Sequence, residues 1–356
     1  MAVYHAPMTG ERGLRHELRN LLQYGDLSFR DFVELALYHP EFGYYTRGAS
    51  PVGKGGDFVT SPSLSPVFSY ALGRLVDEFV SRAGGALSSI VDIGCGDGTL
   101  IRALRSERAR FYGVDRVGGD FRTLDEVPRD GAHLIFSNEL FDALPFARLV
   151  QRGEHVHELF VNEVNGELEW HEHEASPLYE DYFASHGIEL SDGQFADVSL
   201  EWEAMYADVA RFVTQGLIVT FDYGFRAPQL FHPRIRRFGT AAAYRHQRVT
   251  RDLLSNPGEQ DLTAHINFSD LERAGEREGM TTLFFDSQAK FLLSLGITDH
   301  ELFRPIQDVE MTVDLIDPRD EARRLILPDG IGEDIRVLVQ GKGVPLEGWS
   351  FQKKLW

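Results

Sequence analysis

The chain has 356 residues, a formal net charge of −19, and 43% hydrophobic and 26% charged residues. This composition is that of an ordinary folded protein of about two domains, and its acidity argues against nucleic acid or an anionic membrane surface as a partner, because both repel such a field. The single cysteine excludes an internal disulfide, and the lack of a signal peptide and of an apolar run of about 20 residues predicts a cytoplasmic protein.

Two helices are predicted in the N-terminal part of the chain. Apolar residues recur at helical spacing over 14–24 and 28–38, and Ser28 is a suitable N-cap for the second helix. An aromatic, turn-rich stretch over 38–45 follows them.

A glycine-rich run over 53–62 precedes a third predicted helix, over 65–82. Such a run can be a flexible surface loop. This one carries Asp57, Thr60 and Ser61, however, and functional residues concentrate on loops of this kind. We therefore predict a lid that closes over a ligand.

The stretch 90–100 predicts a strand, a sharp turn and the start of a helix. A β-branched run contains Asp92, and Gly94, Gly96 and Gly98 follow at alternate positions. Glycines let the backbone approach a ligand closely, and the N-terminus of the next helix would lie beside it. A strand-to-helix turn can also carry glycine for structural reasons alone, so a nucleotide site needs further support.

Two acidic residues supply that support. Asp115 ends the next predicted strand, about 20 residues beyond the turn, where a carboxylate accepts hydrogen bonds from ribose hydroxyls. Asp92 adds negative charge at the turn, which disfavours the phosphates of NAD and suits the cationic sulfonium of S-adenosylmethionine. We therefore predict S-adenosylmethionine as the cofactor.

A buried strand over 132–137 is followed by Asn138, Glu139 and Asp142. In doubly wound α/β sheets the ligand crevice lies outside the carboxyl ends of the strands, so these side chains are in the right place for chemistry. Helix capping is the alternative, since Asn and Asp are preferred caps.

Apolar and polar residues alternate over 148–170, and Asn165-Gly166 stands between two segments of this pattern, which predicts a β-hairpin. The histidines of this region lack the spacing of a tetrahedral Cys/His site, so we predict no metal there. They are His155, His157, His171 and His173.

In the C-terminal half, a polar helix over 199–213 leads into a predicted strand over 216–224 that contains Asp222. The long connection 225–268 carries Asp261 and His265 and predicts a substrate lid or cap, because long loops without a function are uncommon in compact domains. Two further helices and a final strand complete the prediction; they lie over 269–278, 287–295 and 333–339.

Together these motifs resemble the MidA-type S-adenosylmethionine-dependent methyltransferases, a family that includes a mitochondrial arginine methyltransferase acting as a complex I assembly factor. The resemblance runs nearly end to end. Besides the glycine turn, it rests on the stretches 39–45, 56–62, 137–145, 221–224 and 257–265.

The resemblance implies an α/β class I (Rossmann-like) methyltransferase with a mostly parallel seven-stranded sheet, an N-terminal helical extension and inserted substrate-cap elements. We expect the core at 86–146, 199–224 and 279–356, an N-terminal helical and lid segment at 1–85, a hairpin insertion at 147–198 and a substrate-cap insertion at 225–278. The expected S-adenosylmethionine site consists of Asp57, Thr60, Ser61, Asp92, Gly94, Cys95, Gly96, Asp115 and Asn138.

Some positions depart from the family pattern. Asp92 and Cys95 stand where the family usually has glutamate and proline in the turn, and Asp197 replaces another glutamate. Asp286-Ser287 precedes Gln288 where the family has glycine. We interpret Cys95 as a small residue with a steric role. These changes leave the identity of the substrate open.

The resemblance favours a protein-arginine N-methyltransferase whose partner is a protein that presents an arginine; a homodimer remains an option. Because a guanidinium has a pKa above about 12, carboxylates must orient it and accept the departing proton. The candidates, whose roles the sequence does not order, are Glu139, Asp142, Asp222, Asp261 and His265.

Three other functions are alternatives. A small-molecule methyltransferase and a non-catalytic S-adenosylmethionine-binding assembly protein both stay open. An NAD-dependent oxidoreductase is disfavoured by the glycine spacing and by the acidic turn.

Overall fold

A mixed sheet of seven strands forms the core of the computed structural model, which describes residues 10–47, 65–83, 87–105, 107–246, 248–304, 316–327, 330 and 332–353. Its continuous order is β14-β15-β9-β4-β2-β3, and β13 pairs with the end of β9. The strands are β2 (Ser88–Ile93), β3 (Arg110–Val114), β4 (Ala132–Asn138), β9 (Gly216–Phe225), β13 (Ile266–Asn267), β14 (Thr281–Ser287) and β15 (Ile335–Lys342).

Parallel pairing dominates this sheet. The pairs β2–β3, β2–β4, β4–β9 and β9–β13 are parallel, and only the edge pairs β9–β15 and β14–β15 are antiparallel. The expectation of a mostly parallel seven-stranded sheet is confirmed, although β13 contributes only two residues.

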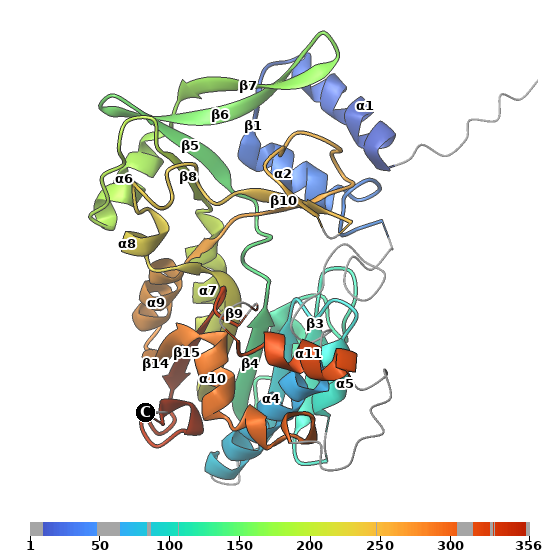
Figure 1. Cartoon of the computed structure of the whole chain (residues 1–356), viewed down its shortest axis with the longest axis vertical. Coiled ribbons are helices and arrows are strands. Elements are labelled where there is room, and N and C mark those ends of the chain that lie inside the picture. The colour runs from blue at the N-terminus through green and yellow to red at the C-terminus, as the bar shows by residue number, and fades with distance from the viewer. Residues whose placement is uncertain are drawn as a thin grey trace, which may run out of the picture.

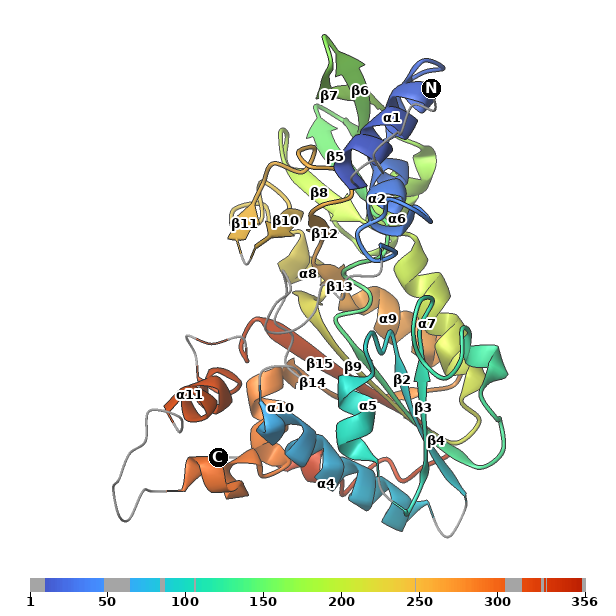
Figure 2. The ribbon, with the colours of Figure 1, turned by 90° about the vertical axis from the view of Figure 1, so that its right-hand side faces the viewer.

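Helices cover both faces of the core sheet, as Figure 2 shows. Successive strand residues alternate between two apolar clusters: Ile90 and Leu134 pack with the first group of helices, and Val91 and Ile135 with the second. The first group is α4 (Pro66–Arg82), α5 (Thr99–Leu104), α10 (Gln288–Ser294) and α11 (Ile316–Arg324). The second is α7 (Glu201–Phe212) and α9 (Phe268–Arg277).

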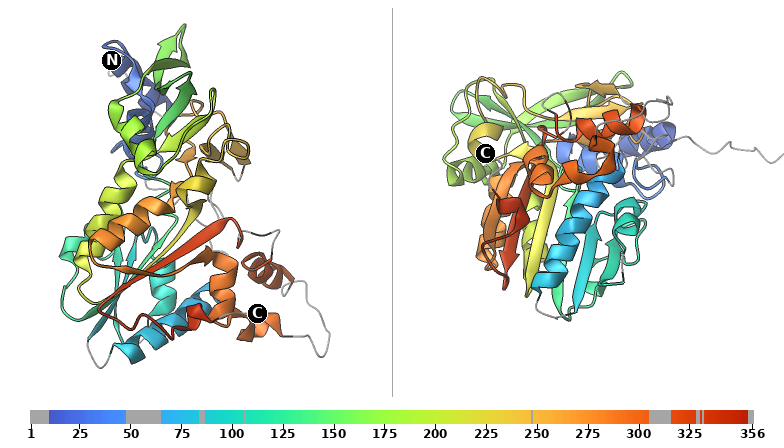
Figure 3. Two further views of the ribbon diagram at one scale, coloured as in Figure 1. Left: turned by 90° about the vertical axis from the view of Figure 1, so that its left-hand side faces the viewer. Right: turned by 60° about the horizontal axis from the view of Figure 1, so that its bottom comes forward.

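A second layer of structure lies beyond one end of the core, at the top of Figures 1 and 3. It contains a five-stranded sheet in which the N-terminal strand β1 pairs with β6. Its strands are β1 (Leu27–Ser28), β5 (Ala147–Arg152), β6 (His155–Val164), β7 (Glu167–Glu174) and β8 (Phe195–Val198). Its helices are α1 (Gly10–Leu22), α2 (Phe29–Tyr38) and α6 (Pro177–Ser185).

A three-stranded sheet, in the order β11-β10-β12, lies against α2 in the same layer. With the short helix α8 it forms most of the segment expected as a substrate cap. The elements are α8 (Ala227–Leu230), β10 (Ala242–Arg245), β11 (Arg248–Thr250) and β12 (Asp261–Thr263). Short 3-10 turns complete the description at Leu124–Glu126, Ile297–Asp299, Glu301–Phe303 and Ser350–Gln352.

Local signals in the sequence placed most of these elements correctly. Ser28 accepts a hydrogen bond from the backbone N–H of Asp31 and so caps α2, as predicted. Asn165 and Gly166 both have left-handed φ values, 54° and 89°, which is the backbone that a two-residue hairpin turn requires. No helix in the described part of the chain is long and apolar enough to cross a membrane.

Several features differ from the prediction. The elements that were not predicted are α6, α8, α11, β1, β8 and β10 to β14; β14, for example, forms a half-buried edge without clear alternation. The helix α4, within the range 1–85 expected as an N-terminal segment, packs on the core sheet. The helix α9, within the range 225–278 expected as a cap, packs against α7 on the core sheet and not in the cap.

Candidate active site

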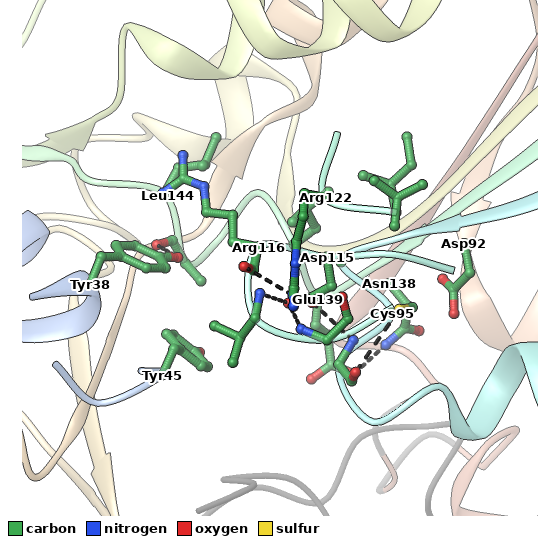
Figure 4. Close-up of a pocket in the computed structure, with 18 of the residues that line it drawn as sticks. Tyr38, Tyr45, Asp92, Cys95, Asp115, Arg116, Arg122, Asn138, Glu139 and Leu144 are labelled. Atoms are coloured by element: carbon green, nitrogen blue, oxygen red, sulfur yellow. Dashed lines mark hydrogen bonds between the residues drawn. The ribbon is translucent and has the colours of Figure 1, made fainter. Parts of the chain in front are cut away.

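A cavity of about 840 Å³ lies at the carboxyl ends of β2, β3 and β4, between the core and the second layer. Figure 4 shows Tyr38 and Tyr45 on one side of it and Asp92 and Cys95 on the other. Segments from the core, from the end of α2 and from the cap strand β12 therefore line one space.

The glycine turn after β2 forms one wall of this cavity. Gly94 and Gly96 have φ values of 72° and 53°, a left-handed backbone that glycine adopts without strain. A Cβ on Gly94 would lie 2.8 Å from Cδ1 of Leu140, whereas a Cβ on Gly96 would meet no atom within 4 Å. The first glycine allows close packing against the neighbouring loop, and the second presents open backbone to a ligand.

Asp115, at the end of β3, holds this turn in place. Its Oδ2 accepts a 3.0 Å hydrogen bond from the backbone N–H of Gly96. Its Oδ1 accepts from the backbone N–H groups of Val117 and Gly118, at 2.8 and 3.2 Å. Since a carboxylate oxygen can accept about two hydrogen bonds, Oδ2 keeps capacity for a ligand hydroxyl.

Asp92 lies on β2 with its side chain buried at the edge of the cavity. Burial, with a smaller contribution from the nearby charge of Asp115, raises the pKa of Asp92 to about 8. A cation beside a buried carboxyl stabilises its ionised form. The buried side chain of Asp92 therefore favours a cationic group of a ligand at this position.

Cys95 lines the same wall and is nearly buried. Burial, together with the charges of Asp92, Asp115 and Asp120, raises the pKa of its thiol to about 12. The thiol is therefore protonated at neutral pH and is a poor nucleophile. Its Sγ would lie 2.8 Å from a Cβ added at Gly113 on the neighbouring strand, which agrees with a steric role.

Asn138 is the last residue of β4 and Glu139 follows it, and both project toward the cavity (Figure 4). The Nδ2 of Asn138 donates to Oε1 of Glu139 at 3.1 Å. Glu139 has a φ of 51°, which costs a non-glycine residue about 1 to 3 kcal/mol. Its backbone N–H donates to the carbonyl of Phe221 at 2.9 Å, a contact that helps to hold the unusual backbone.

Asp222 lies behind this loop and is fully buried. Its Oδ2 accepts from the backbone N–H of Phe141 at 2.9 Å, and its Oδ1 accepts from the backbone N–H of Tyr223 at 2.8 Å. Burial is the main cause that raises the pKa of Asp222 to about 8. Asp222 is absent from the described residues that line the cavity, so its contacts are those of a residue that positions the loop.

Asp142 and Asp261 reach the cavity from two different segments. Burial and the charges of Asp222, Glu139 and Asp261 raise the pKa of Asp142 well above its usual value. The backbone carbonyl of Asp142 accepts from the N–H of Ala264 at 3.2 Å, so the loop after β4 and the cap strand are directly joined.

Two tyrosines from the N-terminal segment complete this side. The hydroxyl of Tyr45 donates to Oδ1 of Asp261 at 3.0 Å, and the hydroxyl of Tyr38 donates to the carbonyl of Ala143 at 2.9 Å. The guanidinium of Arg116 lies 5.1 Å from the centre of the Tyr38 ring. Burial raises the pKa of both tyrosines, so they act as neutral donors.

The charges around the cavity are strongly unequal. Among the described residues that line it, eight are acidic and two, Arg116 and Arg122, are basic. The acidic ones are Glu34, Asp92, Asp97, Asp115, Glu139, Asp142, Asp208 and Asp261. Such a cavity attracts cations and repels phosphates.

Most of the predicted site residues meet at this cavity, with three exceptions. Asp222 lies behind the loop and does not line the cavity. Asp57, Thr60 and Ser61, and with them the predicted lid, lie outside the described residues. His265 is not among the described lining residues; it lies in the cap with its ring centre 6.1 Å from that of Tyr223. Burial and the nearby Arg236 lower the pKa of His265 to about 4, so its imidazole is neutral at physiological pH.

The sequence prediction did not assign Tyr38, Tyr45 or Arg116 to the site. The two tyrosines stand in the aromatic stretch over 38–45, most of which contributes to the family resemblance, but no local pattern indicates which aromatic side chain faces a cavity. The hairpin histidines lie elsewhere: His171 and His173 both contact Oδ2 of Asp26, at 3.0 and 2.6 Å.

The residues present fit S-adenosylmethionine. Oδ2 of Asp115 has acceptor capacity for a ribose hydroxyl, and the open backbone of Gly96 allows a ligand to approach closely. The buried Oδ1 of Asn138 has no hydrogen-bond partner among the described residues. A donor group of the ligand would supply that hydrogen bond. The excess of acidic side chains suits a cationic sulfonium.

Comparison with known proteins points in the same direction. The family model described as "Putative S-adenosyl-L-methionine-dependent methyltransferase" matches residues 116–285. The chain is similar to a mitochondrial protein arginine methyltransferase NDUFAF7 homolog of Caenorhabditis elegans, at 22% identity over 93% of this chain and 84% of the relative. It is also similar to human NDUFAF7, at 24% identity over 80% of this chain and 73% of the relative.

A solved structure resembles nearly the whole molecule. A Burkholderia thailandensis protein crystallised with bound S-adenosyl-homocysteine matches with a TM-score of 0.85 at 26% identity, over 96% of this chain and 95% of that one. A native crystal structure from the same organism matches with a TM-score of 0.82. The likeness includes the second layer and is not confined to the core sheet.

Proposed function

We propose that this chain, which is similar to S-adenosylmethionine-dependent methyltransferases over nearly its whole length, transfers a methyl group to a guanidinium nitrogen of an arginine in a protein partner. The observation that carries the choice of acceptor is the acidic cavity, with eight acidic and two basic side chains among its described lining residues. The names of the similar relatives, which are protein arginine methyltransferases, support the same acceptor.

We assign the cofactor to the glycine-turn side of the cavity. Gly94, Cys95 and Gly96 would contact it through backbone and a small side chain, Asp115 would accept from the ribose, and Asn138 would bind a polar group. When bound, S-adenosylmethionine supplies an electrophilic methyl group on a sulfonium.

We assign the acceptor guanidinium to the opposite side, where Glu139, Asp142 and Asp261 converge. Carboxylates bind a guanidinium through paired, charge-assisted hydrogen bonds, which orient the reacting nitrogen. In the unliganded protein burial disfavours ionisation of Asp142, and a bound guanidinium would restore its charge.

The proton that leaves the guanidinium needs an acceptor. Asp142 and Glu139 are the candidates in the cavity, and the raised pKa of Asp142 makes it the stronger base once it is ionised. Asp222 and His265 do not line the cavity. We therefore assign Asp222 to positioning the loop and give His265 no part in the proton transfer.

Incubation with methyl-labelled S-adenosylmethionine and a cell extract tests the proposal. The expected result is label in protein, recovered as methylarginine after acid hydrolysis, and greatly reduced label with Glu139→Gln. If label is found only in small molecules, the proposal is wrong and the protein is a small-molecule methyltransferase that takes a cationic acceptor. Cofactor binding without transfer to any acceptor would instead indicate a non-catalytic binding protein.

A further inference from the structure

One segment of this acidic protein is strongly basic. Residues 223–251 contain seven arginines and no aspartate or glutamate, whereas the rest of the chain has a formal net charge of −26. So large a difference in charge gives this segment a field opposite to that of the surrounding protein.

Most of these arginines are not neutralised by the fold. Arg226 pairs with Glu272 and Arg245 with Glu259. In contrast, the exposed side chains of Arg234, Arg248 and Arg251 make no ion pair or hydrogen bond with any residue that the structure describes.

Two more arginines add positive charge without an acidic hydrogen-bond partner among the described residues. Arg237 donates to the backbone carbonyl of Asp192 at 3.2 Å, and Arg236 lies over the ring of Phe225 at 4.6 Å. Burial lowers the pKa of Arg236, the negative charge of Asp334 opposes this effect, and the positive charge of Arg251 adds to it, so the two parts of the segment are close enough to interact.

Large apolar side chains are exposed among the arginines. Ile235, Phe238 and Val249 have exposed fractions of 74%, 62% and 64%. Apolar anchors surrounded by charge are a common composition of protein interfaces, in which the charges set the encounter rate and the anchors slow dissociation. We call the surface formed by Arg234, Ile235, Arg237, Phe238, Arg248, Val249 and Arg251 the arginine face.

The arginine face is close to the cavity. In the three-stranded sheet β11-β10-β12, Tyr244 of β10 pairs with the cavity residue Asp261 of β12, and Arg245 of β10 pairs with Arg248 of β11. The strand β11 is thus two strand spacings, roughly 10 Å, from the strand that lines the cavity. Figure 2 shows β10 and β11 at the outer side of the cap, above α8.

We propose that the arginine face docks an acidic surface of the protein substrate and thereby directs a neighbouring arginine of that substrate into the cavity. The inference rests on the proposed function. An acidic protein without such a face would repel an acidic substrate. Binding of the substrate protein at the arginine face would also orient its reacting arginine, which the acidic cavity alone does not do.

A triple charge reversal tests the proposal. The variant is Arg234→Glu, Arg248→Glu and Arg251→Glu, and its matched control is Arg12→Glu, Arg304→Glu and Arg324→Glu, three exposed arginines outside the segment. The control changes the net charge equally. A glutamine version of the triple variant replaces the glutamate version if the latter does not fold.

Binding of fluorescein-labelled poly-L-glutamate, measured by fluorescence anisotropy, is the first readout. We expect the triple variant to lose at least about tenfold in affinity and the control to keep it, with the wild-type affinity falling as salt rises. Equal binding by variant and wild type would overturn the proposal. Tighter binding of phosphatidylserine vesicles or of RNA than of poly-L-glutamate, lost in the variant, would overturn it in favour of a membrane or nucleic-acid surface.

Labelling of extract proteins with methyl-labelled S-adenosylmethionine is the second readout. We expect the triple variant to label acidic proteins at least about tenfold more slowly and to retain wild-type affinity for S-adenosylhomocysteine. An unchanged labelling rate would overturn the docking role. If the wild type labels no protein, the proposed function fails, while the poly-L-glutamate result still decides whether the face binds an acidic chain.

A dimer of the wild type that dissociates in the variant would assign the face to a second copy and overturn the proposal.

Discussion

The hydroxyl of Tyr45 donates a hydrogen bond of 3.0 Å to Oδ1 of Asp261, across 216 residues of sequence. The same oxygen accepts from the backbone N–H of Leu262 at 2.9 Å. This contact joins the segment after α2 to the cap strand β12, and both residues line the cavity. The acceptor side of the site therefore exists only where the N-terminal segment and the cap meet.

Asp261→Asn should reduce methyl transfer at least about tenfold and leave the affinity for S-adenosylhomocysteine nearly unchanged, because the carboxylate faces the acceptor and not the glycine turn. Tyr45→Phe should have a smaller effect in the same direction, since it removes one hydrogen bond and no charge. Label incorporation and titration calorimetry measure the two quantities. Asp252→Asn, in the cap but not among the described lining residues, is the control and should keep full activity. A parallel loss of cofactor affinity would show that Asp261 serves the cofactor.

Asp222→Asn should lower both stability and methyl transfer. An asparagine can accept from one of the two backbone N–H groups, of Phe141 and Tyr223, but places its own donor against the other. We expect a loss of about 1 to 3 kcal/mol in the free energy of unfolding, measured by urea denaturation, and a displaced loop. Ser137→Ala removes the buried bond between Ser137 and Thr220, and should lower stability without lowering activity. Equal activity losses in both variants would argue against a positioning role for Asp222.

The stability of the unliganded protein should fall as the pH rises from about 4 to about 8. The pKa of Asp92 is raised to about 8 in the folded protein from the usual 3.8, so between these values the folded state holds a proton that the unfolded state has released. Unfolding then becomes easier with rising pH, by up to about 1.4 kcal/mol per pH unit for one such group. Asp92→Asn should reduce this slope in urea denaturation measured across that range. A slope equal to that of the wild type would mean that Asp92 is ionised in the folded protein.

Cys95 should be inert and replaceable. Its thiol, with a pKa raised to about 12, should react slowly with iodoacetamide at neutral pH. Cys95→Pro removes two long contacts, the 3.3 Å hydrogen bond from the Cys95 N–H to the carbonyl of Val114 and the 3.9 Å contact of its Sγ with the carbonyl of Gly96, so the affinity for S-adenosylmethionine should stay nearly intact. Mass spectrometry of the alkylated protein and calorimetry measure these outcomes. A large loss of affinity in Cys95→Pro would show that the turn needs the thiol or the N–H.

Much of the cofactor side could be predicted from local sequence. Gly94 and Gly96 indicated a sharp turn, and both have the left-handed backbone that few other residues tolerate; Asp115 was predicted at the end of the next strand. The hairpin at Asn165-Gly166 and the cap at Ser28 were predictable for the same reason: each depends on residues that are adjacent in the chain.

The acceptor side was decided by tertiary structure. Asp222 and Asp142 are both acidic residues at the ends of core strands, yet the fold buries one behind the loop and exposes the other to the cavity. His265 is a plausible base in the sequence, but packing places it beside Tyr223 and lowers its pKa to about 4.

The sequence by itself therefore determined most of the core strands, the cap of α2, the glycine turn and the excess of acidic residues, since these depend on backbone preferences and composition. Only the tertiary structure places Tyr45 in contact with Asp261, buries Asp222 behind the loop and separates the arginine face from the acidic cavity. These properties depend on burial and on contacts between distant segments, and burial sets both the hydrogen-bond partners and the pKa of each ionisable side chain.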